Sequence, residues 1–348
     1  MIIKNIKLSN FRKFSEIEIP IEKNIVVLYG DNAQGKSTIL ESIMLITNGS
    51  SPWASSDEYI STDQEDEKKY TRIEITIDEK TFSFFKNNGR RIFQIDSKKT
   101  TPKKFFEETA STIFNPEQIE ILMISPSKRR DFLDETISLI NYDYSDTLKT
   151  FKKTLRQRNA YLKKLSKDFY EKGIVARNDT QLNFWTEKFT KLAEEIQEKR
   201  VELCNELSSN NIRIEYIKSN EETPLEEKIE ASKKRDIATG YTNIGPHRDD
   251  WNLINGMDIK KFGSRGEKRL SIGQLLFNKQ ELVAKKLGFY PLLLLDDISS
   301  ELDRENTRKV FDKDFLAKQQ TFITIVDYKR LPKEVLEKAQ LINLNSFE

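Results

Sequence analysis

The segment 30–37 constrains the fold of this chain more than any other part of its sequence. It reads Gly-Asp-Asn-Ala-Gln-Gly-Lys-Ser and matches the phosphate-binding pattern G-x-x-x-x-G-K-[ST]. An apolar segment typical of a strand, 25–29, precedes it, and a helical pattern, 37–46, follows it. Because the backbone N–H groups of the loop and the positive end of that helix then surround one phosphate, this order predicts an α/β fold that binds a nucleotide.

Each residue type in this loop suits a particular role in binding phosphate. Glycines let successive N–H groups turn inward around a β-phosphate, Lys36 would span the β- and γ-phosphates, and the Ser37 hydroxyl would occupy one position on Mg²⁺. The alternative, a glycine turn capped by a serine, does not require a lysine beside that serine. The residues expected to bind the nucleotide are Gly30, Asp31, Asn32, Ala33, Gln34, Gly35, Lys36, Ser37 and Thr38.

Hydrolysis needs a second element, and residues 292–297 supply it. They read Leu-Leu-Leu-Leu-Asp-Asp, an apolar run suited to a strand that is buried on both faces and ends in two carboxylates. Asp296 would hold the metal together with Ser37, and Asp297 would take a proton from the attacking water. The alternative is a buried strand followed by a turn with incidental acids. Lys36 and Asp296 are 260 positions apart, so the intervening chain must leave this site and return.

The chain on either side of the loop divides by its hydrophobic pattern. Strand-like segments predict a β-rich lobe beside the first helix, at 2–8, 17–21, 72–77, 81–86 and 91–95. From 142 to 207, apolar residues recur at spacings of three and four and predict two antiparallel helices, with Asp179 or Thr180 as the N-cap of the second. Each helix would be about 42 Å long, and the pair would protrude as an arm. A helical domain packed on the rest of the chain is the alternative.

The last third of the chain returns to an α/β pattern. We expect strands at 291–295, 321–326 and 341–344, with a helix from 304 to about 317. The predicted organisation is the N-terminal part of a head with the β lobe at 1–125, a helical arm at 126–240, and the C-terminal part of the head at 241–348.

The composition excludes several classes of protein. One Cys and one His cannot form a disulfide framework, a zinc site or a Cys/His catalytic pair. No apolar stretch approaches the roughly 20 residues that cross a bilayer, so we expect a soluble, cytoplasmic protein with no membrane partner. With 58 Lys and Arg against 56 Asp and Glu, the net charge of +2 gives no overall attraction to a polyanion. A nucleic-acid site must therefore come from local clusters.

Such a cluster lies on the first arm helix, where residues 147–167 contain eight basic side chains and no acid. Like charges one helical turn apart repel each other, so a bound polyanion is one physical reason for such a run. The alternative is a solvated basic face balanced by acids of the second helix, such as Glu187 and Glu194. Contacts to phosphates would give little sequence specificity and a steep salt dependence. The candidate nucleic-acid contacts are Lys149, Lys152, Lys153, Arg156 and Arg158.

Further stretches follow one another in a characteristic order. They are Leu-Ser-Asn-Phe-Arg at 8–12, the phosphate loop with Asn32, Phe-Asn-Pro-Glu at 114–117, Ser-Pro-Ser-Lys-Arg-Arg-Asp-Phe-Leu-Asp at 125–134, Leu-Arg-Gln-Arg-Asn at 155–159, Gly-Pro-His-Arg-Asp-Asp at 245–250, Ser-Arg-Gly-Glu at 264–267, and Asp-Asp-Ile-Ser-Ser-Glu-Leu-Asp at 296–303. Over essentially the whole chain, this series resembles the RecF family of bacterial DNA replication and repair ATPases, which is related to the SMC-like ABC ATPases. The resemblance implies an ABC-type P-loop ATPase head, a mixed sheet with a β-rich lobe, and an inserted α-helical arm.

The resemblance also implies roles for individual residues. Ser264 stands in the place of the ABC signature motif, which reaches the γ-phosphate bound by a partner subunit, and it joins Lys36 and Asp297 as a catalytic candidate. Arg12 resembles the arginine that approaches the nucleotide from the first strands. The segments 115–118 and 300–303 resemble the loop that senses Mg²⁺ and the loop that touches the dimer interface.

Two of the departures from the family pattern concern the nucleotide site. Its signature reads Ser-Arg-Gly-Glu rather than the LSGGQ of transporters. After the strand 321–326, where transporters place a switch histidine, only Thr324 and Asp327 are available, which leaves γ-phosphate sensing unassigned and predicts slow turnover. The only histidine, His247, is expected to have a structural rather than a catalytic role.

The resemblance implies an ATPase that uses ATP and Mg²⁺, dimerises on ATP, binds duplex DNA at gaps or junctions, and releases the dimer on hydrolysis. Such a protein would act in recombinational DNA repair, replication restart and the SOS response, with recombination-mediator proteins as partners. One alternative is an SMC-like chromosome-structuring ATPase, which the short arm without a hinge disfavours. A transporter ATPase subunit is a weaker alternative, because the LSGGQ sequence is missing and the arm is basic.

Overall fold

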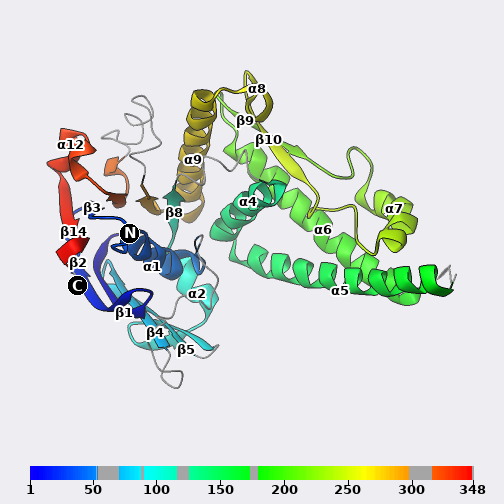
Figure 1. Ribbon diagram of the computed structural model, residues 1–348, viewed down its shortest axis with the longest axis horizontal. Coiled ribbons are helices and arrows are strands. Elements are labelled where there is room, and N and C mark those ends of the chain that lie inside the picture. The colour runs from blue at the N-terminus through cyan, green and yellow to red at the C-terminus, as the bar shows by residue number, and fades with distance from the viewer. Residues whose placement is uncertain are drawn as a thin grey trace. The chain divides into compact units, whose positions relative to one another are not determined.

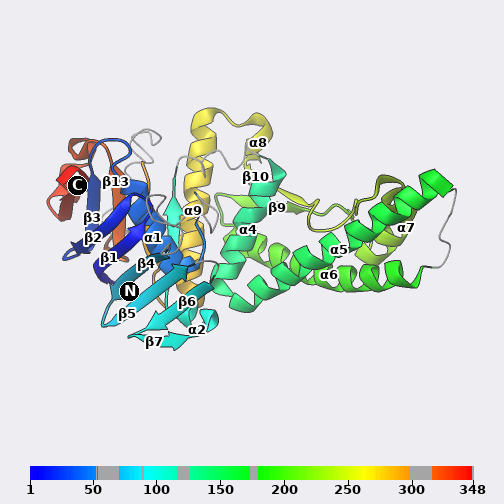
Figure 2. The same ribbon diagram turned by 60° about the horizontal axis from the view of Figure 1, so that its bottom comes forward.

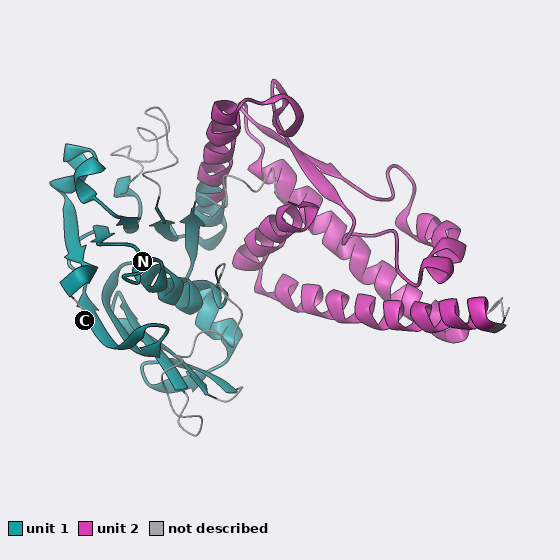
Figure 3. Ribbon diagram, viewed as in Figure 1, with its two compact units in different colours: residues 1–119, 280–348 teal, residues 120–279 magenta. Residues whose placement is uncertain are grey.

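The computed structural model describes residues 1–51, 53, 70–87, 90–115, 125–172, 179–297 and 316–346. The chain forms two compact units (Figure 3). The first contains both ends of the chain, residues 1–119 and 280–348, and the second contains residues 120–279. The predicted arm at 126–240 falls within the second unit, which continues beyond it to Lys279. The chain thus leaves the first unit and returns to it, as the separation of Lys36 from Asp296 requires.

A parallel five-stranded sheet forms one part of the first unit (Figure 1), with the order β14-β3-β13-β12-β8. Its strands are β3 (Ile25–Tyr29), β8 (Ser111–Phe114), β12 (Leu292–Leu295), β13 (Thr321–Ile325) and β14 (Ala339–Asn343). All of β12 and β13 is buried, as expected for interior strands of a parallel sheet. The sequence analysis predicted every strand here except β8, whose sequence Ser-Thr-Ile-Phe has neither a continuous apolar run nor a clear alternation.

An antiparallel six-stranded sheet forms the β-rich lobe of the same unit, in the order β2-β1-β4-β5-β6-β7. Its strands are β1 (Ile3–Phe11), β2 (Phe14–Pro20), β4 (Tyr70–Ile77), β5 (Lys80–Asn87), β6 (Arg90–Ile95) and β7 (Lys98–Thr100). Helix α1 (Lys36–Asn48) and helix α2 (Pro102–Glu107) belong to this core, where Phe105 of α2 packs against Phe82 and Phe93. Helix α12 (Lys333–Leu336) and the short 3-10 turns η3 (Tyr328–Arg330) and η4 (Leu344–Ser346) complete the unit.

The second unit is built around the predicted helix pair (Figure 2), α5 (Tyr142–Lys172) and α6 (Thr180–Leu207). The helices are antiparallel, because Thr147 hydrogen-bonds Glu195 while Arg158 hydrogen-bonds Thr186. Asp179, one of the two residues predicted as the N-cap, caps α6 by accepting hydrogen bonds from the N–H groups of residues 181 and 182. The other elements are α4 (Pro126–Ile140), β9 (Arg213–Ile217), α7 (Leu225–Thr239), β10 (Asp250–Asn255), β11 (Met257–Asp258) and α8 (Ile259–Phe262). Helix α9 (Arg265–Leu287) begins in this unit, and its residues from 280 onward belong to the first unit.

Two ion pairs with buried arginines stabilise the second unit, and each contains a residue of the stretches 125–134 or 245–250 described above. In one pair, Arg129 binds Asp250 through two hydrogen bonds of 2.6 and 2.7 Å. In another, Arg200 makes bonds of 2.8 and 2.9 Å to the two carboxylate oxygens of Asp134. Asp249 is fully buried and accepts hydrogen bonds from side chains and backbone of the same unit. The stretches 125–134 and 245–250 thus have a structural role here.

Candidate nucleotide-binding site

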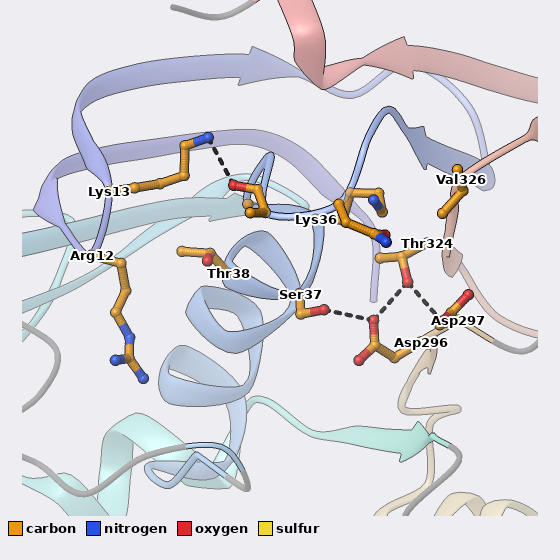
Figure 4. A pocket seen from close by; sticks show the side chains of 12 residues that line it. Arg12, Lys13, Lys36, Ser37, Thr38, Asp296, Asp297, Thr324 and Val326 are labelled. Carbon is orange, nitrogen blue, oxygen red and sulfur yellow. Dashed lines mark hydrogen bonds between the residues drawn. The ribbon is translucent and has the colours of Figure 1, made fainter.

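The phosphate loop connects β3 to α1 and borders a cavity of about 290 Å³ (Figure 4). Gly35 has a φ of +88°, and a β-carbon there would lie 2.5 Å from the Phe14 ring, so a side chain would be strained and would also clash. Gly30 has a φ of +146°, and a β-carbon there would lie 2.5 Å from the side-chain oxygen of Asn345. The cavity is lined by Arg12, Lys13, Asn32, Ala33, Gly35, Lys36, Ser37, Thr38, Asp296, Asp297, Thr324 and Val326.

Asn345 is a residue of this site that the sequence analysis missed. Its side-chain oxygen accepts a hydrogen bond of 3.0 Å from the Asp31 N–H, and its Nδ2 donates to the Asp31 carboxylate at 3.2 Å. The loop is therefore tied to η4, at the other end of the chain. A lone Asn after a strand gives no sequence signal for such a contact.

Lys36 folds over the mouth of the phosphate loop. Its Nζ donates hydrogen bonds to the backbone oxygens of Gly30, at 2.8 Å, and Asp31, at 2.7 Å. Partial burial lowers the pKa of Lys36, although the carboxylates of Asp297, Asp296 and Asp31 act in the opposite direction. An anion in the loop would offer this ammonium group a stronger partner than two neutral carbonyls.

The structure brings Ser37 and Asp296 together across 259 positions of sequence. The Ser37 hydroxyl donates a hydrogen bond of 3.0 Å to Oδ1 of Asp296, whose side chain is buried. Burial raises the pKa of Asp296, while hydrogen bonds from Thr324 and Ser37 partly oppose that shift. Asp297 follows at the rim of the same cavity, with its backbone in the left-handed region at a φ of +44°.

The donor set around Ser37 and Asp296 fits Mg²⁺. A hydroxyl and a carboxylate are hard oxygen ligands, and Mg²⁺ is usually held by one or two carboxylates together with substrate phosphates and water. Within the described part of the chain, no cluster of three or more His, Cys, Asp or Glu side chains could hold a metal by itself. The geometry therefore suits a metal that arrives with a phosphate ligand.

Arg12 lines the cavity, but its guanidinium is held by a partner that the sequence analysis did not identify. It makes two hydrogen bonds to the carboxylate of Glu41, at 2.9 and 3.0 Å. Glu41 lies on α1 and is only 3% exposed. This bidentate pair places the guanidinium group beside the first helix.

Ser264 belongs to the second unit and is not among the residues that line the cavity. It precedes α9, and its hydroxyl and backbone N–H both donate hydrogen bonds to the Glu267 carboxylate, at 2.7 and 2.8 Å. The Glu267 N–H donates in return to the Ser264 hydroxyl at 3.3 Å. This reciprocal capping box explains why a carboxylate stands at the fourth position of the signature-like stretch.

The candidate nucleic-acid contacts on α5 separate into exposed and buried residues. Lys149, Lys152, Lys153 and Arg156 are exposed. Arg158 is 1% exposed, and its guanidinium binds the Asp236 carboxylate at 2.9 Å and the Thr242 hydroxyl at 2.6 Å. Its prediction as a nucleic-acid contact is therefore wrong, because its charge is neutralised inside the second unit.

Two segments with roles implied by resemblance cannot be placed in full. Asn115 lies buried at the end of β8, but residues 116–118 are outside the described residues. The segment 300–303 and most of the helix expected at 304–317 are also outside them.

His247 lies inside the second unit and is not among the cavity-lining residues. Its ring contacts Phe151 and Phe189, and its Nε2 is 2.9 Å from the Thr242 backbone oxygen. Burial, as the largest cause, lowers the pKa of His247 to about 4, and the nearby charges of Arg248 and Arg130 act in the same direction. The fold therefore favours the neutral imidazole.

This lowered pKa predicts a loss of stability in mild acid. Below about pH 6.5 the unfolded chain takes up a proton that the folded chain refuses, so the free energy of unfolding falls as the pH drops toward 4. Between pH 7 and pH 5 the expected loss from His247 is about 2 kcal/mol. Urea unfolding of the wild type and of His247→Gln at both pH values measures it, because the variant lacks the only imidazole. Equal pH slopes in the two proteins would contradict the prediction.

Comparison with known proteins shows the family of the chain. Residues 2–340 match the family model described as the RecF/RecN/SMC N terminal domain. A DNA replication and repair protein RecF from Clostridium kluyveri is 35% identical, with 98% of this chain and 97% of that protein covered. RecF from Lachnoclostridium phytofermentans is 33% identical, covering 90% of this chain and 89% of that protein.

Solved structures of related proteins have a similar fold. A structure of the recombination mediator protein RecF-ATPrS in the RecFOR pathway superposes with a TM-score of 0.81 and 29% identity, covering 95% of this chain and 94% of that one. A RecF-ATP structure has the same TM-score and identity.

The parallel sheet with its phosphate loop, the antiparallel lobe and the inserted helical unit define an SMC-like ATPase head of the ABC type. Within that class, the chain belongs to the RecF family of DNA replication and repair proteins. No helix in the described residues has both the length and the apolar character needed to span a bilayer.

Proposed function

We propose that this chain binds ATP with Mg²⁺, dimerises on ATP, and binds duplex DNA at gaps or junctions during recombinational repair and replication restart. The observation that carries the proposal is the meeting of Lys36, Ser37, Asp296 and Asp297 at one cavity. Its relatives are named as DNA replication and repair proteins, and the RecFOR pathway of the solved relatives supports recombination-mediator proteins as partners.

Different groups of this chain would have different roles in ATP hydrolysis. The backbone N–H groups of the phosphate loop and the Lys36 ammonium would bind the phosphates and favour the charge that develops during transfer. Ser37 and Asp296 would hold Mg²⁺, which supplies neutralisation of phosphate charge. The Asp297 carboxylate, at the cavity rim, would accept a proton from the attacking water.

The proposed dimer depends on Ser264, which is exposed at the start of α9. By resemblance, this hydroxyl would reach the γ-phosphate held by a second copy. Turnover per molecule should then rise with protein concentration, and Ser264→Ala should lower it about 10-fold or more at a concentration that saturates the wild type.

A matched variant separates catalysis from helix capping. Loss of the N-cap alone costs typically about 1 kcal/mol of stability, so Ser264→Asn, which can still cap, serves as the stability control. It should unfold like the wild type and still turn over as slowly as Ser264→Ala. Turnover that is independent of concentration and unaffected by both substitutions would exclude a composite dimer site.

DNA binding is assigned to one side of α5. At about 100° per residue, five basic side chains fall within about 60° of the helix circumference and extend over about 27 Å. We call them the basic stripe: Lys149, Lys152, Arg156, Lys163 and Lys167, all exposed. Lys149 and Lys167 form ion pairs with nearby acids, whereas Lys152, Arg156 and the adjacent Lys153 form none within the described residues. A row of cations at this spacing suits the phosphates of a duplex.

Replacing Lys152, Lys153 and Arg156 together with Gln should weaken duplex binding at least about 10-fold. Loss of three phosphate contacts should also reduce the slope of log affinity against log salt by about 2 to 3. Fluorescence anisotropy of a labelled duplex at several salt concentrations measures both effects. The matched control removes three lysines from α6, as Lys188→Gln/Lys191→Gln/Lys199→Gln. Equal losses in the two triple variants would show that only net charge matters.

The overall proposal is tested by ATP turnover with and without duplex DNA at two salt concentrations. Slow basal turnover that duplex DNA stimulates at low salt, and less at high salt, is expected. Wild-type turnover that DNA leaves unchanged at both concentrations would count against coupling between the two activities.

A further inference from the structure

Thr324 of β13 is the central hydrogen-bonding residue between the two acids of the site. Its hydroxyl donates a hydrogen bond of 2.6 Å to Oδ1 of Asp296 and accepts one of 2.9 Å from the backbone N–H of Asp297 (Figure 4). The side chain is fully buried, and β13 lies between β3, which leads into the phosphate loop, and β12, which leads into the acids. One hydroxyl therefore contacts both acidic residues, one through its side chain and one through its backbone.

The hydrogen bond between Thr324 and Asp297 helps to hold an unusual backbone conformation at Asp297. Asp297 has a φ of +44°, and the left-handed region costs a non-glycine residue roughly 1 to 2 kcal/mol. Such a conformation persists only where its surroundings hold it. The partly buried hydrogen bond from the Asp297 N–H to the Thr324 hydroxyl is one such interaction.

The hydrogen bond from Thr324 to Asp296 would remain if Ser37 turned away from Asp296. In this structure Oδ1 of Asp296 accepts hydrogen bonds from both Ser37 and Thr324. Ser37 is the hydroxyl that would turn to a metal ion with the nucleotide. Thr324 is then the donor that still orients the Asp296 carboxylate.

Asp327, the other side chain available after this strand, has a local role. Its carboxylate accepts a hydrogen bond of 3.0 Å from the Lys329 N–H and caps η3, and it is not among the cavity-lining residues. Of the two residues that could take the place of a switch histidine, only Thr324 contacts the acids.

We propose that Thr324 is a positioning residue for ATP hydrolysis, which sets the Asp296 carboxylate and the Asp297 backbone in one arrangement. The inference rests on the proposed function, because it concerns the same site. A displacement of about 1 Å in a reacting group can cost about 100-fold in rate, so loss of this hydroxyl should affect the chemical step far more than nucleotide binding by the loop.

The test compares Thr324→Val, which keeps the branched shape but removes the hydroxyl, with Thr324→Ser, which keeps the hydroxyl, and Asp327→Ala. Measurements are kcat and the affinity for a fluorescent ATP analogue with and without Mg²⁺. For Thr324→Val we expect kcat to fall at least about 30-fold, affinity without Mg²⁺ to stay within about 3-fold, and the gain in affinity on adding Mg²⁺ to shrink. Thr324→Ser and Asp327→Ala should stay within about 3-fold of the wild type.

The outcomes distinguish this inference from the proposed function. If the wild type hydrolyses ATP and Thr324→Val matches it in kcat and Mg²⁺ response, the positioning role is excluded while the proposed function stands. If the wild type neither binds nor hydrolyses ATP, the proposed function itself fails. Should Thr324→Val not fold, Thr324→Ala replaces it, and a kcat for Thr324→Ser as low as that of Thr324→Ala would equally exclude the role of the hydroxyl.

Discussion

Replacing Lys36 with Ala is expected to lower ATP turnover at least about 100-fold, or about 2.7 kcal/mol in transition-state stabilisation. The Lys36 ammonium is partly buried over the phosphate loop, and within the described residues it donates hydrogen bonds to two backbone carbonyls of that loop. A phosphate would therefore be its first strong partner, and no other side chain of the loop carries a positive charge. Because this contact would strengthen as charge develops on the transferring phosphate, kcat should fall along with affinity.

The control for Lys36→Ala is Lys7→Ala. Lys7 is a partly exposed residue of β1 that forms ion pairs with Glu16 and Glu18 on the neighbouring strand. Exposed pairs of this kind contribute little to stability, so this variant should retain wild-type turnover. A folded Lys36→Ala protein with turnover close to that of Lys7→Ala would contradict the assignment of the phosphate site.

Replacing Arg158 with Leu is expected to lower the free energy of unfolding by about 3 to 5 kcal/mol. Arg158 and Asp236 are each about 1% exposed, and the substitution would leave the Asp236 carboxylate buried without its cation. The Thr242 hydroxyl would lose a hydrogen bond of 2.6 Å as well. Urea unfolding of the full chain, followed by circular dichroism, measures the loss.

Two companion variants sharpen this prediction. Arg156→Leu removes the same charge from an exposed position two residues away and should change stability by only about 0.5 kcal/mol. The double variant Arg158→Leu/Asp236→Leu removes both charges and should recover part of the stability lost in the single variant. A single variant as stable as the wild type would mean that the pair is not buried in solution.

Much of the nucleotide site could be predicted from local sequence. The phosphate loop carries its own strand, glycines, lysine and helix start within about 20 residues, and four consecutive leucines before Asp296 are a clear sign of a buried strand. Since parallel strands end at the same edge of a sheet, the approach of Ser37 to Asp296 followed from these two motifs.

Contacts between distant segments could not be predicted in this way. Glu41 and Asn345 hold Arg12 and the phosphate loop, yet nothing near them in the sequence indicates those partners. Their contacts depend on the packing of α1 and on the return of the chain's last strand to β3.

The error at Arg158 is different, because the sequence did contain the signal. At about 100° per residue, Arg158 lies on the same side of the helix as Phe151 and Leu162, which are both buried. It points about 120° away from Lys152 and about 160° away from Arg156 around the helix. The position of Arg158 on the helix, rather than its place in the run of basic residues, correctly predicts that it is buried.

Determining the structure of the chain with a slowly hydrolysed ATP analogue and Mg²⁺ would show where a triphosphate binds. We expect its β- and γ-phosphates in the loop 30–37, contacted by Lys36, with the metal ion shared between Ser37 and Asp296. A nucleotide bound elsewhere, or one in the loop whose metal makes no contact with Asp296 directly or through water, would contradict this assignment.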